Sequence, residues 1–446
     1  MPDDERDPLP IRAMTRGFKL AALPVGFAGR TTLGVGKRLA GAPAEAVLHE
    51  IQLRTADQVF TVLGQLKGGA MKLGQAMSIF EAALPEEFAE PYRKTLRKLQ
   101  DSAPPMPPGV VRRVMVSQFG EQWTDRFAEF NETPAAAASI GQVHRGMWRT
   151  ENGDDIDVAV KLQYPGAGKA LRADLRHLAR LSRLFAVIAP SVDVAAIAEE
   201  LQERVIEELD YALEAQHQQA FADAFRDDPE ILVPDVVSHT EQALVSTWLE
   251  STGSLADIID AGSQQERDQY GLRYVRFLFA GPERTGLLHA DPHPGNYRVM
   301  PDGRLGVVDF GAVARLPEGV PAELGLLLRM AAEGEYAELE AELRRLGFLK
   351  PDVKLDADSV GRFVAPFVAP AQSEEFTFNR EWLRQQVLRV SAPTAEGLGT
   401  SLRINLPREY VLLHRVWVGG IGVLCQLGAT ARFRDVLEES MPGFAR

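Results

Sequence analysis

Two short motifs near the middle of the chain constrain its fold and chemistry more than any other feature. The first places Asp291 five positions before Asn296, in the run His289–Asn296 (HADPHPGN). The second is Asp309-Phe310-Gly311, which begins 13 positions after Asn296. Asp and Asn supply the hard oxygen ligands that Mg²⁺ prefers, and another carboxylate beside them can orient a reacting hydroxyl group. The pair of motifs therefore predicts a site for a metal-bound phosphate.

Either motif alone has a simpler explanation, because Asp, Pro, Gly and Asn also form tight turns. The residues between them read as a β-hairpin, with strands at Tyr297–Met300 and Leu305–Val308 joined by a turn. A loop with Asp and Asn, then a short hairpin, then Asp-Phe-Gly is the order typical of protein kinases. In that arrangement Asp291 orients the attacking hydroxyl or water, while Asn296 and Asp309 hold Mg²⁺.

A candidate phosphate-binding lysine precedes these motifs. Asp157–Gln163 (DVAVKLQ) alternates apolar and polar residues, which predicts a strand that carries Lys161. Before it, Thr133–Val143 (TPAAAASIGQV) stands where kinases have a glycine-rich phosphate loop. Alanine keeps the loop small but lacks the freedom of glycine at positive φ, so we expect a stiffer loop. Its predicted nucleotide-binding residues are Ala136, Ala137, Ala138, Ser139, Ile140 and Val143.

A kinase lysine needs a carboxylate on a facing helix to hold it in position. Val194–Phe221 has an apolar stripe of helical spacing and several acidic residues. Asp210 and Glu214 share a helix face, whereas Glu208 and Asp210 do not on a regular helix. Glu208 and Asp210 can both reach one site only if the helix turns, ends or is approached from two sides. Periodicity leaves open which of these carboxylates reach the site.

The other expected elements follow in order. Ile231–Pro234 and Ala243–Glu250 read as the last strands of a small antiparallel sheet, and the second runs into the hinge that holds adenine, at Trp248. Helices are expected at Gln264–Phe279, Glu323–Leu346 and Arg408–Leu427. The apolar run Val416–Ala431 is short and rich in glycine, so we interpret it as a buried helix and not as a membrane span.

Composition limits the class of protein. With 446 residues, 45% hydrophobic and 25% charged, the chain is ordinary globular material. A net charge of −13 argues against a nucleic-acid binder, which needs a basic face. The single cysteine, Cys425, excludes an internal disulfide framework and fits a reducing compartment. Because Met1–Asp7 is acidic where a signal peptide would be basic, we expect a cytoplasmic protein.

The first hundred residues differ from the rest. Pro8–Ala44 holds six basic residues and no acid, interleaved with apolar ones. Such a stretch can lie on the inner face of an anionic membrane, or it can be a solvated arm or a helix packed on the acidic remainder. Glu50–Leu99 reads as helices interrupted at Pro85, and it contains the glycine-rich element Lys67–Met77 (KGGAMKLGQAM). The proline-rich tract Ala103–Gly109 is a linker.

Together these motifs resemble the UbiB (AarF-like) atypical kinases, the group that includes the mitochondrial coenzyme Q kinase-like proteins. The resemblance covers about Val59–Leu316. The motifs that carry it are Lys72-Leu73-Gly74-Gln75, Ala136–His144, Val158-Ala159-Val160-Lys161, Glu208-Leu209-Asp210-Tyr211, Glu214, His289–Asn296 and Asp309-Phe310-Gly311.

The resemblance implies an α+β, bilobal, protein-kinase-like fold, with a small antiparallel-sheet N-lobe, a helical C-lobe and a helical N-terminal extension. It implies that Lys161 pairs with Glu214, and that the Lys72–Gln75 element folds over the site so that Lys72 meets Glu208 and Asp210. The domains expected are a basic amphipathic segment 1–49, the extension and linker 50–108, the N-lobe 109–250 and the C-lobe 251–446.

The resemblance further implies ATP and Mg²⁺ as cofactors, and ATP hydrolysis that supports isoprenoid-quinone or related lipid metabolism at a membrane surface. A lipid or a lipid-biosynthesis complex would be the partner, and an oligomer is compatible with the sequence. Two alternatives stay open: a nucleotide-binding scaffold (a pseudokinase), and a small-molecule phosphotransferase of the aminoglycoside-kinase type. The second is disfavoured because the Lys72 element would obstruct an acceptor pocket.

Overall fold

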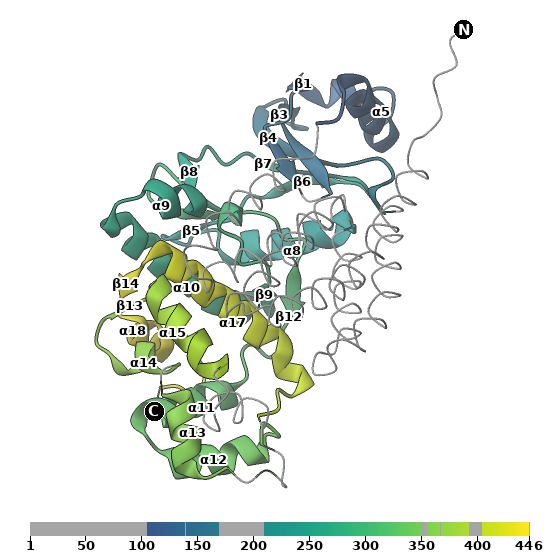
Figure 1. The fold of residues 1–446 in the computed structure, drawn as a ribbon. Helices are drawn as coiled ribbons and strands as arrows, with labels where there is room; N and C mark the ends of the chain where they lie inside the picture. Colours follow the sequence, from purple (N-terminus) through teal and green to yellow (C-terminus); the bar gives the residue numbers. More distant parts are fainter. Residues whose placement is uncertain are drawn as a thin grey trace, which may run out of the picture.

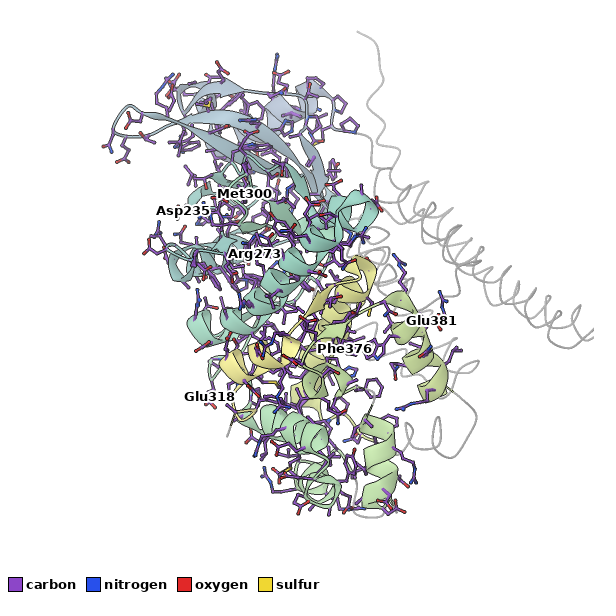
Figure 2. All side chains as sticks on the ribbon, turned by 90° about the vertical axis from the view of Figure 1, so that its left-hand side faces the viewer. Asp235, Arg273, Met300, Glu318, Phe376 and Glu381 are labelled. Atoms are coloured by element: carbon purple, nitrogen blue, oxygen red, sulfur yellow. The ribbon has the colours of Figure 1, made fainter. Side chains whose placement is uncertain are left out.

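The computed structural model describes residues 105–138, 140–168, 209–349, 353, 355–365, 367–391 and 404–445. Within them, a small lobe built on a β-sheet lies above a larger lobe of helices, which we call the N-lobe and the C-lobe (Figures 1 and 2). The predicted segment 1–49 and most of the extension, with Lys72 and Gln75, lie outside the described residues.

The N-lobe is an antiparallel sheet of order β1-β3-β4-β7-β6, with β2 paired to β3. Helix α5 (Pro108–Phe119) begins with proline, whose missing N–H costs nothing in a first turn, and it buries Val111 and Met115 against one face of the sheet. Helix α8 (Tyr211–Ala224) lies on the other face. The strands are β1 (Phe127–Phe130), β2 (Ala136–Ala138), β3 (Gly141–Arg149), β4 (Asp155–Gln163), β6 (Val236–His239) and β7 (Ala243–Thr247).

A buried hydrogen-bond relay joins the end of the linker to this sheet. The Met106 backbone N–H donates to Gln142 Oε1 at 2.8 Å, and Gln142 Nε2 donates to His144 Nε2 at 2.7 Å. His144 Nδ1 donates to the Asn131 carbonyl oxygen at 2.8 Å. Only the neutral imidazole can make both bonds, because one nitrogen must accept and the other must donate. Burial also lowers the pKa of His144, which favours the neutral form.

The C-lobe is organised around α10 (Gln264–Thr285) and α17 (Arg408–Leu427), which pack side by side (Figure 1). Capping boxes at Ser254 and Ser263 start α9 (Leu255–Ala261) and α10. The remaining helices are α11 (Ala322–Glu333), α12 (Tyr336–Arg345), α13 (Ala357–Val364), α14 (Ala369–Gln372), α15 (Arg380–Ser391) and α18 (Phe433–Ser440). The short strands are β5 (Ile231–Leu232), β8 (Gly253–Ser254), β9 (Leu287–His289), β10 (Tyr297–Val299), β11 (Leu305–Val307), β12 (Val313–Arg315), β13 (Phe376–Thr377) and β14 (Thr430–Ala431).

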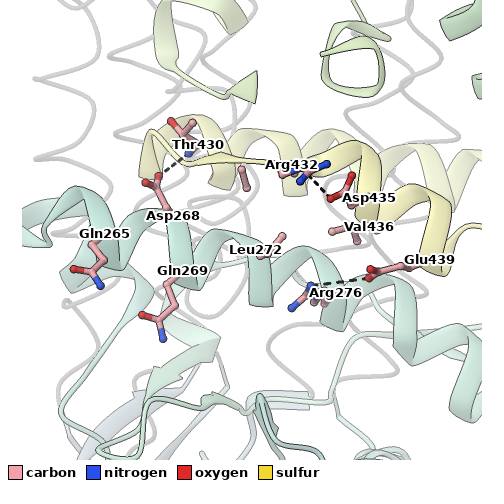
Figure 3. A pocket seen from close by; sticks show the side chains of 11 residues that line it. Gln265, Asp268, Gln269, Leu272, Arg276, Thr430, Arg432, Asp435, Val436 and Glu439 are labelled. Carbon is pink, nitrogen blue, oxygen red and sulfur yellow. Dashed lines mark hydrogen bonds and ion pairs between the residues drawn. The ribbon is translucent and has the colours of Figure 1, made fainter. Parts of the chain in front are cut away.

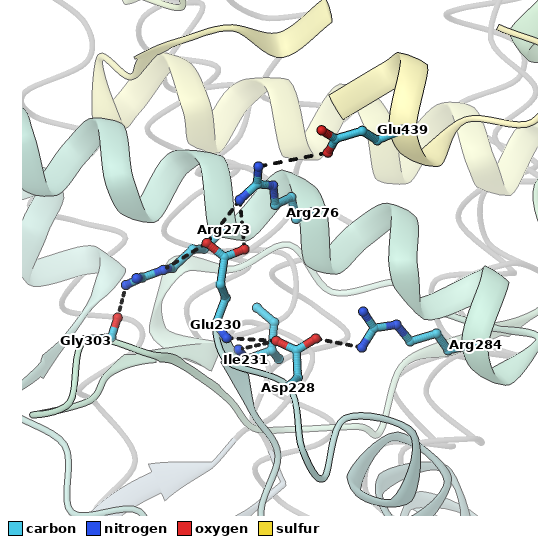
Figure 4. Close-up of polar contacts among 8 residues, drawn as sticks. All are labelled: Asp228, Glu230, Ile231, Arg273, Arg276, Arg284, Gly303 and Glu439. Atoms are coloured by element: carbon cyan, nitrogen blue, oxygen red, sulfur yellow. Dashed lines mark hydrogen bonds and ion pairs between the residues drawn. The ribbon is translucent and has the colours of Figure 1, made fainter. Parts of the chain in front are cut away.

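The structure corrects the assignment of Ile231–Pro234. Strand β5 does not extend the N-lobe sheet but pairs in parallel with β11 in a second sheet of order β5-β11-β10-β8. The residues before it hold it there, because Glu230 accepts from Arg276 Nη1 at 2.9 Å and Asp228 from Arg284 Nη1 at 2.6 Å (Figure 4). Both arginines belong to α10, so β5 is fixed to the C-lobe.

The helix predicted at Glu323–Leu346 is two helices. Gly334 ends α11 in a left-handed conformation with φ of 78°, which is accessible to glycine at little cost, and α12 begins two residues later. The hairpin between the two central motifs and the helix Arg408–Leu427 lie where the sequence predicts them.

Among the described residues, one helical stretch, Tyr410–Leu427, is long and apolar enough to cross a membrane by length and composition, with mean hydropathy 1.4. More than half of it (56%) is buried within the protein. Leu413, Val416 and Val423 are at most 1% exposed and share the core with Tyr274 and Phe277 of α10. The helix thus packs as a core helix of the C-lobe.

The relay predicts how stability depends on pH. The unfolded imidazole of His144 binds a proton below its ordinary pKa of about 6.5, whereas the buried one resists it. Stability should therefore fall as the pH drops below about 6.5. The free energy of unfolding is measured by denaturant titration from pH 7.5 to 5. It should fall less steeply with pH in the His144→Gln variant than in the unsubstituted protein, and the two slopes should differ by at most about 1.4 kcal/mol per pH unit.

The exposed His239→Gln variant is the matched control and should keep the slope of the unsubstituted protein. An identical slope in His144→Gln would show that this histidine does not resist protonation in the folded state.

Candidate active site

Three elements bring charged side chains together between the lobes. Lys161 on β4 donates from Nζ to Glu214 Oε1 of α8 at 2.7 Å and to Asp309 Oδ1 at 3.1 Å. The Glu214 side chain is 2% exposed, that of Lys161 15% and that of Asp309 27%. The pairing of Lys161 with Glu214 was expected from the family resemblance alone, and the structure shows it.

The electrostatics of the cluster follow from burial and charge. Burial by itself lowers the pKa of Lys161, but the carboxylates of Asp309 and Glu214 outweigh it and hold the pKa well above its ordinary value. Lys161 is therefore a permanent cation between the Glu214 and Asp309 carboxylates. A buried charge of this kind is stable only with partners, so removing either carboxylate changes the charge of the whole site.

The start of helix α8 decides the roles of Asp210 and Glu214, between which helical periodicity does not choose. Asp210 is its N-cap, and the Asp210 carboxylate accepts from the Leu213 backbone N–H at 3.0 Å. The helix does not run continuously from Val194 as predicted, because Asp210 is in a non-helical conformation before Tyr211. Glu214 then follows in the first turn and points to Lys161, while Glu208 lies outside the described residues.

The two central motifs are tied to each other by hydrogen bonds. His289 donates from Nε2 to the Asp309 carbonyl oxygen at 2.9 Å, and the Val308 N–H donates to the Asn296 carbonyl oxygen at 2.9 Å. Asp291 Oδ1 accepts from the His293 N–H at 3.3 Å. No local pattern in the sequence predicts this positioning role of His289, although the residue stands at the start of the first motif.

Asp309 has a strained backbone. Its φ is 66°, and it is the one non-glycine residue with positive φ among those the structure describes. Asp tolerates this left-handed region better than most residues, but the conformation still needs support from its surroundings. The next residue supplies it: Phe310 is fully buried, with its ring 5.0 Å from that of Phe221 on α8 and 5.3 Å from that of His289.

The alanine-rich loop is a tight β-hairpin. Strands β2 and β3 pair Ala136 with Val143 and Ala138 with Gly141, and Val143 lies across from Lys161. Because facing residues in an antiparallel sheet share a face, Ala136 and Val143 are on the Lys161 side and Ala137 is on the other. Ile140 is buried at the turn, and Ser139 lies outside the described residues.

The predicted hinge follows β7. Strand β7 ends at Thr247, and the Trp248 backbone N–H makes one further bond to the sheet, donating to the Asp157 carbonyl oxygen at 2.9 Å. Arg145 of β3 stacks on the Trp248 ring, with its guanidinium 4.9 Å from the ring centroid, and donates to Glu250 at 2.7 Å. Arg145 was not predicted, and its position depends on strand register.

The residues predicted to hold metal fit a hard cation. The Asn296 side chain is 7% exposed, and its Nδ2 has no hydrogen-bond partner among the described residues. Rotating the amide by half a turn would put its carbonyl oxygen at that position, where a cation would satisfy it. Together with the Asp309 carboxylate this is an oxygen donor set suited to Mg²⁺. The described residues hold no group of three or more His, Cys, Asp or Glu placed to bind a metal.

A separate groove lies between α10, β14 and α18 (Figure 3). Its volume is about 640 Å³. Arg432 pairs with Asp435 at 3.0 Å and Arg276 with Glu439 at 4.0 Å, while the Asp268 carboxylate accepts from the Thr430 backbone N–H at 2.7 Å. None of the predicted site residues lines this groove.

A bilobal fold with a lysine–glutamate pair and the two aspartate motifs defines a kinase-like protein. Residues 98–342 match the family model described as the ABC1 atypical kinase-like domain, which is more than half of the chain. The chain belongs to this family, the UbiB group of atypical kinases that its motifs predicted.

The chain is similar to several known relatives. It is 32% identical over 309 residues to the Arabidopsis thaliana chloroplastic protein ACTIVITY OF BC1 COMPLEX KINASE 1, covering 67% of this chain and 43% of that protein. It is 25% identical over 440 residues to the mitochondrial atypical kinase COQ8B of Rattus norvegicus, covering 97% and 81%. The chain thus spans less than half of the first relative's length.

Among solved structures, the chain resembles that of Rv3197 from Mycobacterium tuberculosis in complex with erythromycin. The two are 42% identical, with a TM-score of 0.69, and the match covers 91% of this chain and 100% of that one.

Proposed function

We propose that this protein binds ATP with Mg²⁺ and hydrolyses it, in support of isoprenoid-quinone or related lipid metabolism at a membrane surface. The observation that carries the proposal is the cluster of Lys161, Glu214 and Asp309, which joins both lobes at one buried charge. Phosphoryl transfer depends mainly on positioning and on charge stabilisation, and this cluster supplies both.

Each residue has a distinct role in the proposal. Lys161 binds the α- and β-phosphates and Glu214 fixes its position. Asn296 and Asp309 would hold Mg²⁺, which neutralises charge on the phosphates when bound. Asp291, five residues before Asn296, orients a water or hydroxyl group for attack. A bound triphosphate also offers Lys161 the negative charge that Asp309 now provides, which leaves the Asp309 carboxylate for the metal.

The first test is ATP turnover in two variants. Asp309→Asn removes a metal-binding charge and should lower turnover by about 100-fold or more. Asp291→Asn removes the group that orients the nucleophile and should lower turnover by about 100- to 10,000-fold while ATP still binds. Phosphate release and the ATP dissociation constant are measured for both, with Asp302→Asn in the exposed hairpin turn as control.

Turnover by Asp309→Asn at the level of the unsubstituted protein would contradict the hydrolysis proposal. A cell in which Asp291→Asn keeps full function without hydrolysis would favour the scaffold alternative.

The membrane part of the proposal is supported by the surface of three helices. All five large hydrophobic residues that are exposed in the described part of the chain lie on or next to α13, α15 and α17, and Leu388 is 65% exposed. Arg389 of α15 donates to the Phe363 carbonyl oxygen of α13 at 2.7 Å, so the helices are neighbours. They carry six arginines and three acids, a net +3 in a chain of net −13. The exposed residues are Phe367, Val387, Leu388, Val411 and Val418.

This surface should bind anionic bilayers. Flotation with phosphatidylcholine vesicles that contain phosphatidylglycerol should recover the protein, and added salt should weaken binding. The double variant Val387→Gln/Leu388→Gln should lower the bound fraction by about threefold or more. Arg389→Gln should also weaken binding, whereas Arg226→Gln, an exposed arginine at the end of α8, should not. Equal binding by all four proteins would exclude this surface as the contact.

A second candidate function, phosphorylation of a macrolide, is favoured by the likeness to Rv3197. That protein was solved with erythromycin and is 42% identical over nearly the whole chain. Erythromycin carries hydroxyl groups that could accept a phosphoryl group, which connects it to the small-molecule phosphotransferase alternative. Incubation with Mg-ATP and erythromycin, followed by mass spectrometry, should then reveal a macrolide heavier by one phosphoryl group. An unchanged macrolide with a raised melting temperature of the protein would indicate binding alone, and neither change would remove this candidate.

A further inference from the structure

Tyr211 is a buried aromatic residue that the roles above leave without an assignment. It is the first residue of α8, directly after the N-cap Asp210, and it is 0% exposed. Glu214 follows three positions later on the same helix face. The chain therefore puts Tyr211 beside the carboxylate that holds Lys161.

The face of the Tyr211 ring lies against the Lys161 ammonium group. The distance from Nζ to the ring centroid is 5.3 Å, within the range of about 6 Å in which a cation is attracted by the ring quadrupole. Lys161 is thus held from three directions, by Glu214 at 2.7 Å, by Asp309 at 3.1 Å and by this ring. Of the three contacts, only the ring attracts the cation without adding negative charge to the site.

Tyr211 also joins the lysine to the alanine-rich hairpin. It shares a buried cluster with Ile140 at the hairpin turn, with Ala215 of α8 and with Leu244 of β7. Leu244 lies directly across from Lys161 in the sheet. The same ring that contacts the lysine therefore packs with the tip of the loop and with its neighbouring strand.

The hydroxyl group does not explain the burial of this residue. Tyr211 Oη has no hydrogen-bond partner among the described residues, and a buried hydroxyl without a partner is destabilising. The ring is the part of the side chain that makes the contacts, and a phenylalanine would keep all of them.

We propose that Tyr211 is a positioning residue, whose ring face holds the Lys161 ammonium group in the place where it binds the phosphates of ATP. This inference rests on the proposed function, because it concerns the affinity of the same site for phosphates. It adds that the ring, and not the hydroxyl or the volume of the side chain, carries the effect.

The test compares two substitutions and two ligands. Tyr211→Phe keeps the ring, so its dissociation constant for Mg-ATP should stay within about twofold of that of the unsubstituted protein. Tyr211→Leu keeps apolar volume without a ring, and should weaken Mg-ATP binding by about three- to thirtyfold. Adenosine lacks phosphates, so its affinity should be the same in all three proteins. Calorimetry at 20 °C measures both ligands, after near-UV circular dichroism has shown that each variant is folded.

Phe225→Leu is the matched control. Phe225 is also buried, at the other end of α8, and its ring lies under a cation, with Arg284 at 4.5 Å from the centroid, but away from Lys161. It should lower the melting temperature and leave the affinity for Mg-ATP unchanged.

Three results would overturn the inference: Mg-ATP binding by Tyr211→Leu within twofold of the unsubstituted protein, equal weakening in Tyr211→Phe and Tyr211→Leu, or equal losses for adenosine and Mg-ATP. If the unsubstituted protein binds adenosine but not Mg-ATP, the proposed function itself fails, and this outcome is distinct from the other three.

Discussion

The buried ammonium group of Lys161 is the interaction on which both lobes depend. A cation at this depth needs compensating charge, and it takes one carboxylate from α8 and one from the loop after β11. Lys161 is therefore the point at which three parts of the protein meet: the N-lobe sheet, helix α8 and the Asp309-Phe310-Gly311 motif of the C-lobe. A movement of any of them changes the distances between these three charges.

The residues that hold Asp309 in place beside Lys161 are uncharged. His289 holds the strained backbone of Asp309 through its carbonyl oxygen, and Phe310 inserts between α8 and the C-lobe. Burial keeps the pKa of His289 below its ordinary value, so the imidazole is neutral and can donate from one nitrogen while the other accepts from Tyr297 at 3.3 Å. The residues that hold the Asp309 backbone in place thus add no charge of their own beside Lys161 and its two carboxylates.

The two faces of the N-lobe sheet pack against different parts of the protein. Residues on the Lys161 side pack against α8, whereas residues on the Leu162 side pack against α5 and Met106. Gln142 and His144 lie on the second side, where their relay connects Met106 to the loop before β2. Met106 is therefore hydrogen-bonded to the β2–β3 hairpin, whose other face lies beside Lys161.

The sequence by itself determined the two aspartate motifs, the strand with Lys161, the hairpin between the motifs and the helix Arg408–Leu427. Each of these depends on local spacing: a period of two for the strand, a helical period for the helix and turn residues between fixed positions. The family was also recognisable from the sequence, through the resemblance of these motifs to those of the UbiB atypical kinases.

Only the tertiary structure decided which acidic residue meets the lysine. Helical periodicity treats Asp210 and Glu214 alike, but Asp210 caps the helix and Glu214 lies buried against Lys161. It also decided that β5 joins the lower sheet and that Ala137 faces away from Lys161. Contacts with α10 and strand register settle these points, and both arise between segments far apart in the chain, where no local pattern records them.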